Sequence, residues 1–419
     1  MSKMAIKKIR VKNYKSFRDI DVNLGKFNIL IGANASGKSN FVEVFRFLRD
    51  IVSSGLENAV SLQGGIEYLR NVNVNNSQDI SLYIESDYPM NALKKTKKGL
   101  IGIKIYETQY SMTLTYKKKG LDFSVIEDVL KHKCDLFQME EKKKGELEEK
   151  EKIGSGTIVY SNENGKITVE VKPKKFLLKE DDVFPPFLKD ITIGSTQSLL
   201  EFPFLFPPTM EANFSETSIY DFDPKIPKKA TPITGKAELE EDGANLSIIL
   251  KNIIKNKDSK RKLFNLVRDI LPYIDDLDVE KFADKSLLFK LRETYNPKQY
   301  LPASLISDGT VNITALLIAL YFEKKKLTII EEPERRIHPH ILSKLIQMMR
   351  DASKKKQIII TTHNPEIVKH TKLDEILLAA RDQDGFSTIT RPSDNEQVKI
   401  FLQNEMGIED LYIQNLLEV

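Results

Sequence analysis

Residues 31–40 read IGANASGKSN, and this short stretch decides the fold. It contains the pattern G-x-x-x-x-G-K-S, whose fixed positions are Gly32, Gly37, Lys38 and Ser39. The apolar run FNIL precedes the pattern, and FVEVFRFLRDIV follows it with apolar residues at helical spacing. A strand, a glycine-rich loop and a helix are therefore expected in that order, which is the context in which this pattern binds phosphate.

Each part of the loop has a physical role in this interpretation. The glycines let backbone N–H groups wrap around phosphate oxygens, and the helix N-terminus adds positive potential. Lys38 is expected to reach the β- and γ-phosphate oxygens, and the Ser39 hydroxyl to bind Mg²⁺. The residues predicted to bind ATP are Gly32, Asn34, Ala35, Ser36, Gly37, Lys38, Ser39 and Asn40.

A second motif, LTIIEEPERRIHP, spans residues 327–339 and ends an apolar strand with two adjacent carboxylates. Charge at such a position is costly unless something there requires it. Enzymes with this kind of loop place an acid at the end of a neighbouring strand to hold Mg²⁺, and we assign this metal-binding role to Glu331. Glu332 would then lie beside the γ-phosphate and act as the general base that polarises the attacking water.

Two further segments complete the candidate site. QIIITTHN, residues 357–364, is a third apolar strand, and ligand sites lie at the carboxyl ends of parallel strands, so His363 is a candidate γ-phosphate contact. SLISDGT precedes a buried helix and places Ser307, Asp308 and Gly309 where a helix presents free amides to an anion. Alone, the first would be a structural histidine and the second an ordinary helix cap.

Taken in this order, the motifs resemble the ABC-type ATPase heads of the SMC, RecF and OLD families. The resemblance covers about residues 1–75 and 240–390, including the opening IRVKNYKSFRDIDVNLGKFNILIGANASGKSN. It implies an α/β fold, a P-loop ATPase head with a mixed sheet surrounded by helices. It also implies ATP and Mg²⁺ as cofactors and ATP hydrolysis as the activity.

The same resemblance assigns roles and a partner. SDGT would stand for the signature that caps the ATP on another subunit's P-loop, which gives a homodimer or higher oligomer assembled through ATP. Glu332 would be the catalytic glutamate, His363 the switch histidine, and ERRIHP the dimer-facing D-loop region. Glu331 replaces the more common Asp, Asp308 replaces a glycine, and the Q-loop glutamine is either Gln63 or Gln78.

The predicted domain organisation is a head made of residues 1–84 and 236–419 and an inserted β-rich subdomain, 85–235. Within the insertion and just before it, strands are expected at 79–86, 100–107 and 110–116. Other predicted features are an Asn164-Gly165 hairpin turn, a charged helix or solvated excursion at 139–152, and the strand SLLFKLRE at 286–293 within the second, mostly parallel α/β lobe.

Composition sets broad limits. The chain of 419 residues is 41% apolar, which is ample for a core, and its net charge of only +4 does not by itself demand nucleic acid. Cys134 is the single cysteine, and no apolar stretch reaches the ~20 residues of a membrane span. These observations predict a reducing, cytoplasmic location without a membrane partner.

Two functions remain open. In the first, ATP hydrolysis and dimerisation act on DNA, in repair, maintenance or defence against foreign DNA, and the lysine clusters of the insertion line a phosphate-binding surface. In the second, the chain is an ATP-dependent sensor or scaffold that controls a separately encoded effector, such as a nuclease in anti-phage defence, and the lysines are solvated turns. OLD-type nucleases carry a Toprim domain after the ATPase, but only 56 residues follow His363 here, and Asp382 and Asp384 of RDQDG are interpreted as a turn. Nuclease activity is therefore not expected in this chain.

Overall fold

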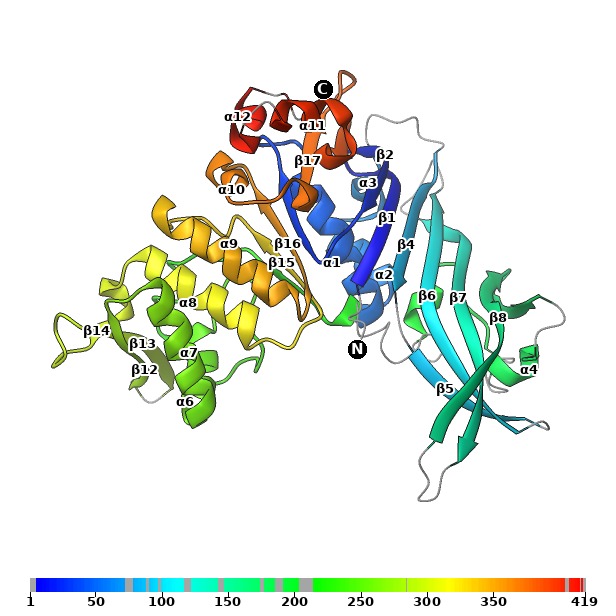
Figure 1. Ribbon diagram of the computed structural model, residues 1–419, viewed down its shortest axis with the longest axis horizontal. Helices are drawn as coiled ribbons and strands as arrows, with labels where there is room; N and C mark the ends of the chain where they lie inside the picture. The colour runs from blue at the N-terminus through cyan, green and yellow to red at the C-terminus, as the bar shows by residue number, and fades with distance from the viewer. Residues whose placement is uncertain are drawn as a thin grey trace. The chain divides into compact units, whose positions relative to one another are not determined.

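The computed structural model forms two compact units (Figure 1). Unit 1 comprises residues 1–25, 39–216 and 380–389, and unit 2 comprises residues 26–38, 217–379 and 390–419. The structure describes residues 5–71, 78–87, 90–96, 99–116, 122–141, 147–173, 177–184, 191–202, 214–283, 285–403, 407–414 and 416.

A parallel sheet forms the centre of unit 2. Its strands run in the order β10 (Thr217–Tyr220), β15 (Leu327–Glu331), β16 (Gln357–Thr362), β3 (Phe27–Ile31) and β17 (Ile376–Arg381). Nearly every side chain of the three central strands is buried, as expected for a parallel sheet covered on both faces. The predicted parallel arrangement of these strands is confirmed.

Helices bury the apolar side chains of this sheet in one core. The helix α8 (Asp308–Tyr321) is almost completely buried, which explains why its sequence is apolar on all sides. The remaining helices of unit 2 are α6 (Leu246–Lys255), α7 (Lys257–Ile270), α9 (Pro339–Ser353), α10 (Pro365–Lys369), α11 (Glu396–Gln403) and α12 (Ile408–Ile413), with short 3₁₀ turns at Ala303–Leu305, Leu373–Glu375 and Pro392–Asp394.

A second, smaller sheet in unit 2 is antiparallel. It contains β11 (Thr231–Pro232), β13 (Ser286–Glu293), β12 (Ile274–Phe282) and β14 (Leu301–Pro302). The predicted strand at 286–293 is confirmed as β13, but it belongs to this antiparallel sheet and not to a mostly parallel one as expected. The short connection from β12 allows only an antiparallel neighbour, because a parallel one needs a long crossover.

Unit 1 contains long antiparallel strands (Figure 1). Their order is β18, β2, β1, β4, β6, β7, β8 and β9, with β5 paired to β6 and β18 parallel to β2. The strands are β1 (Ala5–Tyr14), β2 (Phe17–Asn23), β4 (Ile80–Asp87), β5 (Met90–Thr96), β6 (Gly99–Tyr116), β7 (Phe123–Glu141), β8 (Leu147–Glu163), β9 (Lys166–Lys172) and β18 (Ser387–Thr390). Its helices are α1 (Lys38–Ser54), α2 (Leu56–Leu62), α3 (Ile66–Leu69), α4 (Glu180–Val183) and the 3₁₀ helix η2 (Leu199–Glu201).

Two predictions for unit 1 need correction. The segments 100–107 and 110–116 form the single strand β6 instead of two strands. The charged stretch 139–152 is neither a helix nor a solvated excursion in its described residues, because it ends β7 and begins β8. Cross-strand ion pairs accompany this pairing, Lys150 Nζ to Glu140 Oε2 at 2.6 Å and Lys152 Nζ to Asp135 Oδ1 at 2.8 Å.

The predicted Asn164-Gly165 hairpin turn is confirmed. Asn164 and Gly165 form the turn between β8 and β9 with φ of +53° and +83°, the left-handed values that a two-residue hairpin requires. The Cys134 thiol is buried, and burial raises its pKa to about 11. Among the described residues, every helix is too short or too polar to cross a bilayer. The domain boundaries at 85 and 235 stay a prediction.

A buried carboxyl group joins β7 to η2 in unit 1. Asp128 accepts hydrogen bonds from the Tyr110 hydroxyl at 2.8 Å and from the Leu199 amide at 2.6 Å. Burial raises the pKa of Asp128 from 3.8 to about 7, although these hydrogen bonds act in the opposite direction. The folded chain therefore retains this proton at pH values where the unfolded chain has released it.

This retained proton makes stability depend on pH. Between pH 4 and 7 the unfolded chain binds fewer protons at Asp128, so the free energy of unfolding falls as pH rises, by at most about 1.4 kcal/mol per pH unit. We expect Asp128→Asn to have a shallower fall over this range, measured by urea denaturation at pH 4.5, 5.5, 6.5 and 7.5. Identical slopes for the two proteins would contradict the buried, protonated carboxyl group.

Candidate nucleotide-binding site

The loop between β3 and α1 has the geometry that its sequence predicts. Gly37 has φ of +109°, which only glycine adopts without strain, and Ala35 is held at +62°. A Cβ atom on Gly32 would lie 2.2 Å from the carbonyl oxygen of Ala379, so this position also has no space for a side chain. The hydroxyl of Ser36 is buried and has no hydrogen-bond partner within the described residues. An orphaned donor in a glycine-bounded loop fits a bound phosphate.

Lys38 begins α1 and turns back over this loop. Its ammonium group donates to the carbonyl oxygens of Gly32 at 2.9 Å and Ala33 at 2.8 Å. Burial lowers the pKa of Lys38 from its ordinary value, and nearby carboxylates act in the opposite direction. The loop therefore holds a desolvated cation beside its own carbonyls, ready to exchange them for phosphate oxygens.

The remaining predicted residues of the loop differ in exposure. Asn34, Ala35 and Ser39 are exposed, whereas Asn40 is half-buried and donates from Nδ2 to the Ser16 hydroxyl at 2.7 Å. Ser39 directly follows Lys38 in the first turn of α1, the position at which the G-x-x-x-x-G-K-S pattern has its hydroxyl-bearing residue.

The parallel register aligns the ends of three strands. Glu331 in β15 lies opposite Thr361 in β16, and Thr361 lies opposite Leu30 in β3. The residue after each strand end consequently emerges at the same edge of the sheet, and the carboxylates of Glu332 and Glu331 are near enough to influence Lys38 electrostatically. The structure thus brings the predicted acidic pair and the phosphate loop together.

Glu332 forms the centre of a charged cluster. Its Oε1 accepts a hydrogen bond from His363 Nδ1 at 2.7 Å, and its Oε2 accepts one from Arg335 at 3.1 Å. Burial alone would raise the pKa of Glu332, but these two hydrogen bonds outweigh it and hold the pKa below the ordinary value. Glu332 also has φ of +44°, a strained conformation that non-glycine residues keep mainly at functional sites.

The predicted signature forms the start of α8. Ser307 is the N-cap, and its hydroxyl oxygen accepts a hydrogen bond from the Thr310 amide at 3.2 Å. Asp308 makes a very short ion pair with Lys228, and this hydrogen bond lowers the pKa of the carboxyl group. A Cβ atom on Gly309 would lie 2.6 Å from the carbonyl oxygen of Arg336, so the helix start contacts the turn that follows Glu332.

Sequence reasoning missed three residues around this site. Lys228, which neutralises Asp308, belongs to the lysine cluster PKIPKKA, but no local signal pairs it with Asp308. Asn312 is a buried polar residue inside the largely apolar helix α8. Glu334 is the third acid of the sequence EEPE, and its proximity to the two predicted glutamates was the available signal. Burial raises the pKa of Glu334, and its carboxylate also influences Lys38.

The other predicted residues have ordinary surroundings. Gln63 bridges Lys15 and Glu43 with hydrogen bonds of 2.6 and 2.8 Å, and Gln78 is exposed, so the Q-loop assignment stays a prediction. Asp382 Oδ1 accepts hydrogen bonds from two amides of its own turn. The interpretation of RDQDG as a turn is confirmed. The described residues contain no cluster of three or more His, Cys, Asp or Glu side chains suited to a metal ion.

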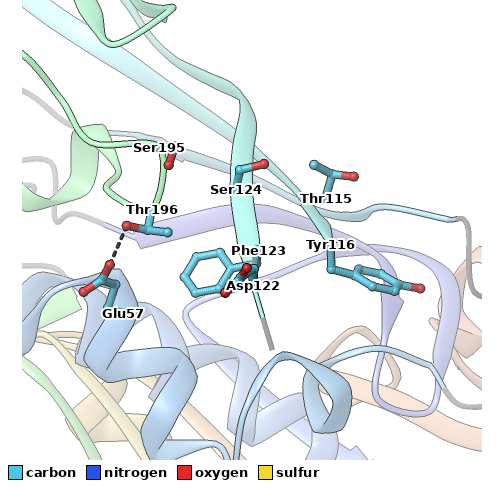
Figure 2. Close-up of a pocket in the computed structure, with 8 residues that line it drawn as sticks. All are labelled: Glu57, Thr115, Tyr116, Asp122, Phe123, Ser124, Ser195 and Thr196. Carbon is cyan, nitrogen blue, oxygen red and sulfur yellow. Dashed lines mark hydrogen bonds between the residues drawn. The ribbon is translucent and has the colours of Figure 1, made fainter. Parts of the chain in front are cut away.

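A pocket of about 720 Å³ lies in unit 1 (Figure 2). Thr196 donates to Glu57 Oε1 at 2.5 Å on one of its walls. Its described lining contains two carboxylates, two aromatic rings and four hydroxyl-bearing residues of the Ser and Thr types, but no lysine or arginine: Glu57, Thr115, Tyr116, Asp122, Phe123, Ser124, Ser195 and Thr196. These residues do not favour an anionic ligand, and none of them belongs to the predicted ATP site.

Comparison with known families identifies the class of protein. A family model described as "AAA domain, putative AbiEii toxin, Type IV TA system" matches residues 27–128 and 135–369. The chain belongs to this AAA-domain family. The matched ranges contain the phosphate loop, the acidic strand end and His363. This match confirms the predicted recognition of an ATPase head of the SMC, RecF and OLD kind.

Two curated proteins are similar to this AAA-domain chain. Endonuclease GajA of Bacillus cereus (strain VD045) is 22% identical over 389 residues, which are 87% of this chain and 56% of that protein. Uncharacterized protein MJECL43 of Methanocaldococcus jannaschii is 27% identical over 150 residues, which are 32% of this chain and 39% of that protein. The chain therefore spans about half, or less, of the length of these relatives.

Solved structures of SMC heads also match the AAA-domain chain. The SmcHead bound to the C-winged helix domain of ScpA has a TM-score of 0.48 at 15% identity, covering 92% of this chain and 96% of that chain. The Smc head domain with an extended coiled coil, bound to the C-terminal domain of ScpA from Pyrococcus furiosus, has a TM-score of 0.48 at 14% identity, covering 96% and 100%.

Gly32→Ala tests the tight contact of the phosphate loop. The new methyl group would collide with the backbone carbonyl of Ala379, which cannot rotate away, and we expect a loss of about 1–3 kcal/mol in the free energy of unfolding. Gly235→Ala is the matched control, because there the methyl group meets only the flexible end of Ile248. Equal losses for the two variants in chemical denaturation would contradict this difference.

Proposed function

We propose that this AAA-domain chain binds ATP with Mg²⁺ at the β3–α1 loop and hydrolyses it, with Glu332 as the general base. The observation that carries the proposal is the cluster of Lys38, Glu332 and His363 at one edge of a parallel sheet. The Glu332 carboxylate acts to raise the pKa of Lys38, and His363 Nδ1 bonds to Glu332 Oε1 at 2.7 Å. The family match supports an ATPase at the level of the family.

Each residue has a defined task in the proposed reaction. The loop amides around Ser36 and Gly37 bind the phosphates, and Lys38 replaces its bonds to loop carbonyls by bonds to β- and γ-phosphate oxygens. Ser39 and Glu331 would hold Mg²⁺, the latter through water. When bound, Mg²⁺ neutralises charge that develops on the phosphate oxygens.

Glu332 would accept a proton from the attacking water. Its lowered pKa keeps the carboxylate ionised at neutral pH, as a base requires. The hydrogen bonds to His363 and Arg335 fix both of its oxygens, so one of them has to exchange its partner for water during the reaction. His363 is exposed at this edge and can then contact the γ-phosphate.

The second part of the proposal is an ATP-dependent homodimer or higher oligomer. In it, Ser307, Asp308 and Gly309 of one subunit cap the ATP on the loop of another. The exposed Ser307 N-cap and the free amides of the first turn of α8 support this assignment, because they offer hydrogen-bond donors to an anion. Lys228 neutralises Asp308, which would otherwise repel the γ-phosphate.

For the output of the cycle, we favour an action on DNA, in repair, maintenance or defence. The similarity to a protein named as an endonuclease supports this direction. The second candidate is control of a separately encoded effector, such as a nuclease in anti-phage defence, and the same similarity supports it. Of the predicted lysine clusters, PKIPKKA lies within the described residues, whereas parts of LKKTKKG, YKKKG and VKPKKF lie outside them.

Lys38→Ala is expected to abolish ATP binding, because the loop loses the only lysine of the G-x-x-x-x-G-K-S pattern and its charge-assisted bonds to the phosphates. Equilibrium binding of a fluorescent ATP analogue measures this loss. Lys354→Ala is the control, since Lys354 is exposed, pairs with Asp351 and lies outside the predicted ATP site. Retained ATP affinity in the Lys38 variant would overturn the assignment of the phosphate loop.

Glu332→Gln is expected to keep ATP affinity while the hydrolysis rate falls about 10²–10⁴-fold, because the amide cannot accept the proton. The variant should also accumulate as a larger species in Mg-ATP, which light scattering detects against the nucleotide-free sample. Turnover at the wild-type rate would overturn the base assignment. Absence of a mass increase despite bound ATP would overturn the capped dimer.

Duplex DNA binding in Mg-ATP distinguishes the two outputs. An action on DNA predicts an affinity that falls steeply with salt and weakens when Lys225 and Lys229 are changed to Gln. Control of a separate effector predicts no salt-dependent DNA affinity and no effect of these changes. Lys228 is left intact in this experiment because it pairs with Asp308.

A further inference from the structure

A buried amide in α8 contacts the turn that follows Glu332. Asn312 is 2% exposed, and its Nδ2 donates to the carbonyl oxygens of Arg335 at 2.7 Å and Pro333 at 3.3 Å. One side chain thus holds two backbone groups of residues 333–336, which we call the acidic turn. Asn312 lies in the same helix as Ser307 and Gly309, slightly more than one helical turn after its start.

The start of α8 contacts the same turn directly. The position of a Cβ atom on Gly309 is only 2.6 Å from the Arg336 carbonyl oxygen, a separation that leaves space for hydrogen alone. Together with the two bonds of Asn312, this contact ties the first two turns of α8 to the acidic turn along its length. A displacement of the helix start must therefore displace the acidic turn as well.

On its other side, the acidic turn is bonded to the end of β16. The Thr362 hydroxyl donates a very short hydrogen bond to Glu334 Oε1, and Thr362 Oγ1 accepts from the Asn364 amide at 2.9 Å. The Glu332 amide donates to the Thr361 carbonyl at 2.9 Å. The bonded residues Thr361, Thr362 and Asn364 flank His363 in the sequence. Their hydrogen bonds therefore set the position of His363 relative to Glu332.

Packing alone does not explain the polar side chains in this chain of contacts. Asn312 Oδ1 and Glu334 Oε2 are buried, and neither atom has a hydrogen-bond partner within the described residues. Buried polar atoms that stay unpaired cost stability, and apolar side chains of similar size would fill the same volume without that cost. The presence of polar residues at 312 and 334 is accounted for if the geometry of the acidic turn matters more than the stability that apolar residues would add.

We propose that Asn312 and Glu334 are positioning residues of the ATPase reaction and that the acidic turn links the start of α8 to the Glu332–His363 pair. This inference rests on the proposed function. When the start of α8 caps a nucleotide, the hydrogen bonds of Asn312 fix the acidic turn relative to the helix. The hydrogen bond between Glu334 and Thr362 then fixes the end of β16 relative to the turn. Hydrolysis of the ATP bound to a subunit's own phosphate loop then depends on whether the start of α8 in that subunit contacts a nucleotide.

Asn312→Leu tests the inference, and Asn245→Leu is its matched control. Asn245 is also 2% exposed, and its Nδ2 donates to two backbone carbonyls, of Glu238 at 2.7 Å and Lys236 at 3.1 Å, outside the candidate site. We expect both variants to lose thermal stability, but only Asn312→Leu to lose kcat, by about 10–100-fold, because the base is misplaced. The KM for ATP should change little, since the phosphate loop is intact.

The Thr362 side supplies a second test that does not depend on the folding of Asn312→Leu. Thr362→Val removes the hydroxyl that bonds to Glu334, and Thr362→Ser restores it. We expect a kcat loss in the first variant and recovery in the second. Thr328→Val is the control, because Thr328 is a buried hydroxyl of the neighbouring strand β15 without a hydrogen-bond partner in the described residues.

The outcomes separate this inference from the proposed function. Absence of ATP turnover in the wild-type protein would overturn the proposed function and, with it, the inference. Wild-type turnover together with an unchanged kcat in Asn312→Leu and Thr362→Val would overturn only the inference. An equal loss of kcat in Asn245→Leu would also overturn it, because the effect would then be one of general stability.

Discussion

The parallel register of β16 between β15 and β3 is the constraint on which the rest of the structure depends. It aligns Glu331 with Thr361, and Thr361 with Leu30. Successive residues of a strand alternate between the two faces of the sheet, whereas the carboxyl ends of parallel strands lie at one edge. The three segments that follow these strands therefore meet at that edge. A slip of one residue in either pairing would separate His363 from Glu332 and leave the half-buried Glu332 carboxylate without this partner.

The site that forms at this edge is held under both electrostatic and backbone strain. Burial lowers the pKa of Lys38, and nearby carboxylates act to raise it, which favours the charged form of the lysine. Without this positive charge the carboxylates would repel one another. Glu332 and Ala35 both adopt left-handed conformations that cost stability. Such strain persists only because the buried sheet and α8 hold the surrounding backbone, and the same support keeps the side chains of the candidate site in place.

Local patterns were sufficient for the phosphate loop, the acidic strand end and most strands, because each is encoded within about ten consecutive residues. The errors arose where distant residues decide the outcome. β6 looked like two strands because the polar Thr108 interrupts its apolar run, but Thr108 is fully buried and bonds to His132 of β7 at 2.9 Å.

The same reason explains the missed site residues. Asn312 and Glu334 acquire their meaning only from backbone carbonyls and a hydroxyl that are supplied by other elements of the fold. Lys228 pairs with Asp308, a residue 80 positions away in the chain. No periodicity in the sequence reports such pairings, because periodicity describes which face of an element is buried and not which polar atoms meet there.

The charged strands of unit 1 have a consequence for the behaviour of this sheet in different salt solutions. Their exposed ends lack the apolar alternation that normally fixes strand register, and ion pairs such as Lys150 with Glu140 take over that role. Exposed pairs are screened at high ionic strength, whereas the buried parts of β6 and β7 are not. The described strand ends, residues 139–141 and 147–152, should therefore loosen as the salt concentration increases while the buried part of the sheet stays paired, which makes ionic strength a local control on the pairing of β7 with β8.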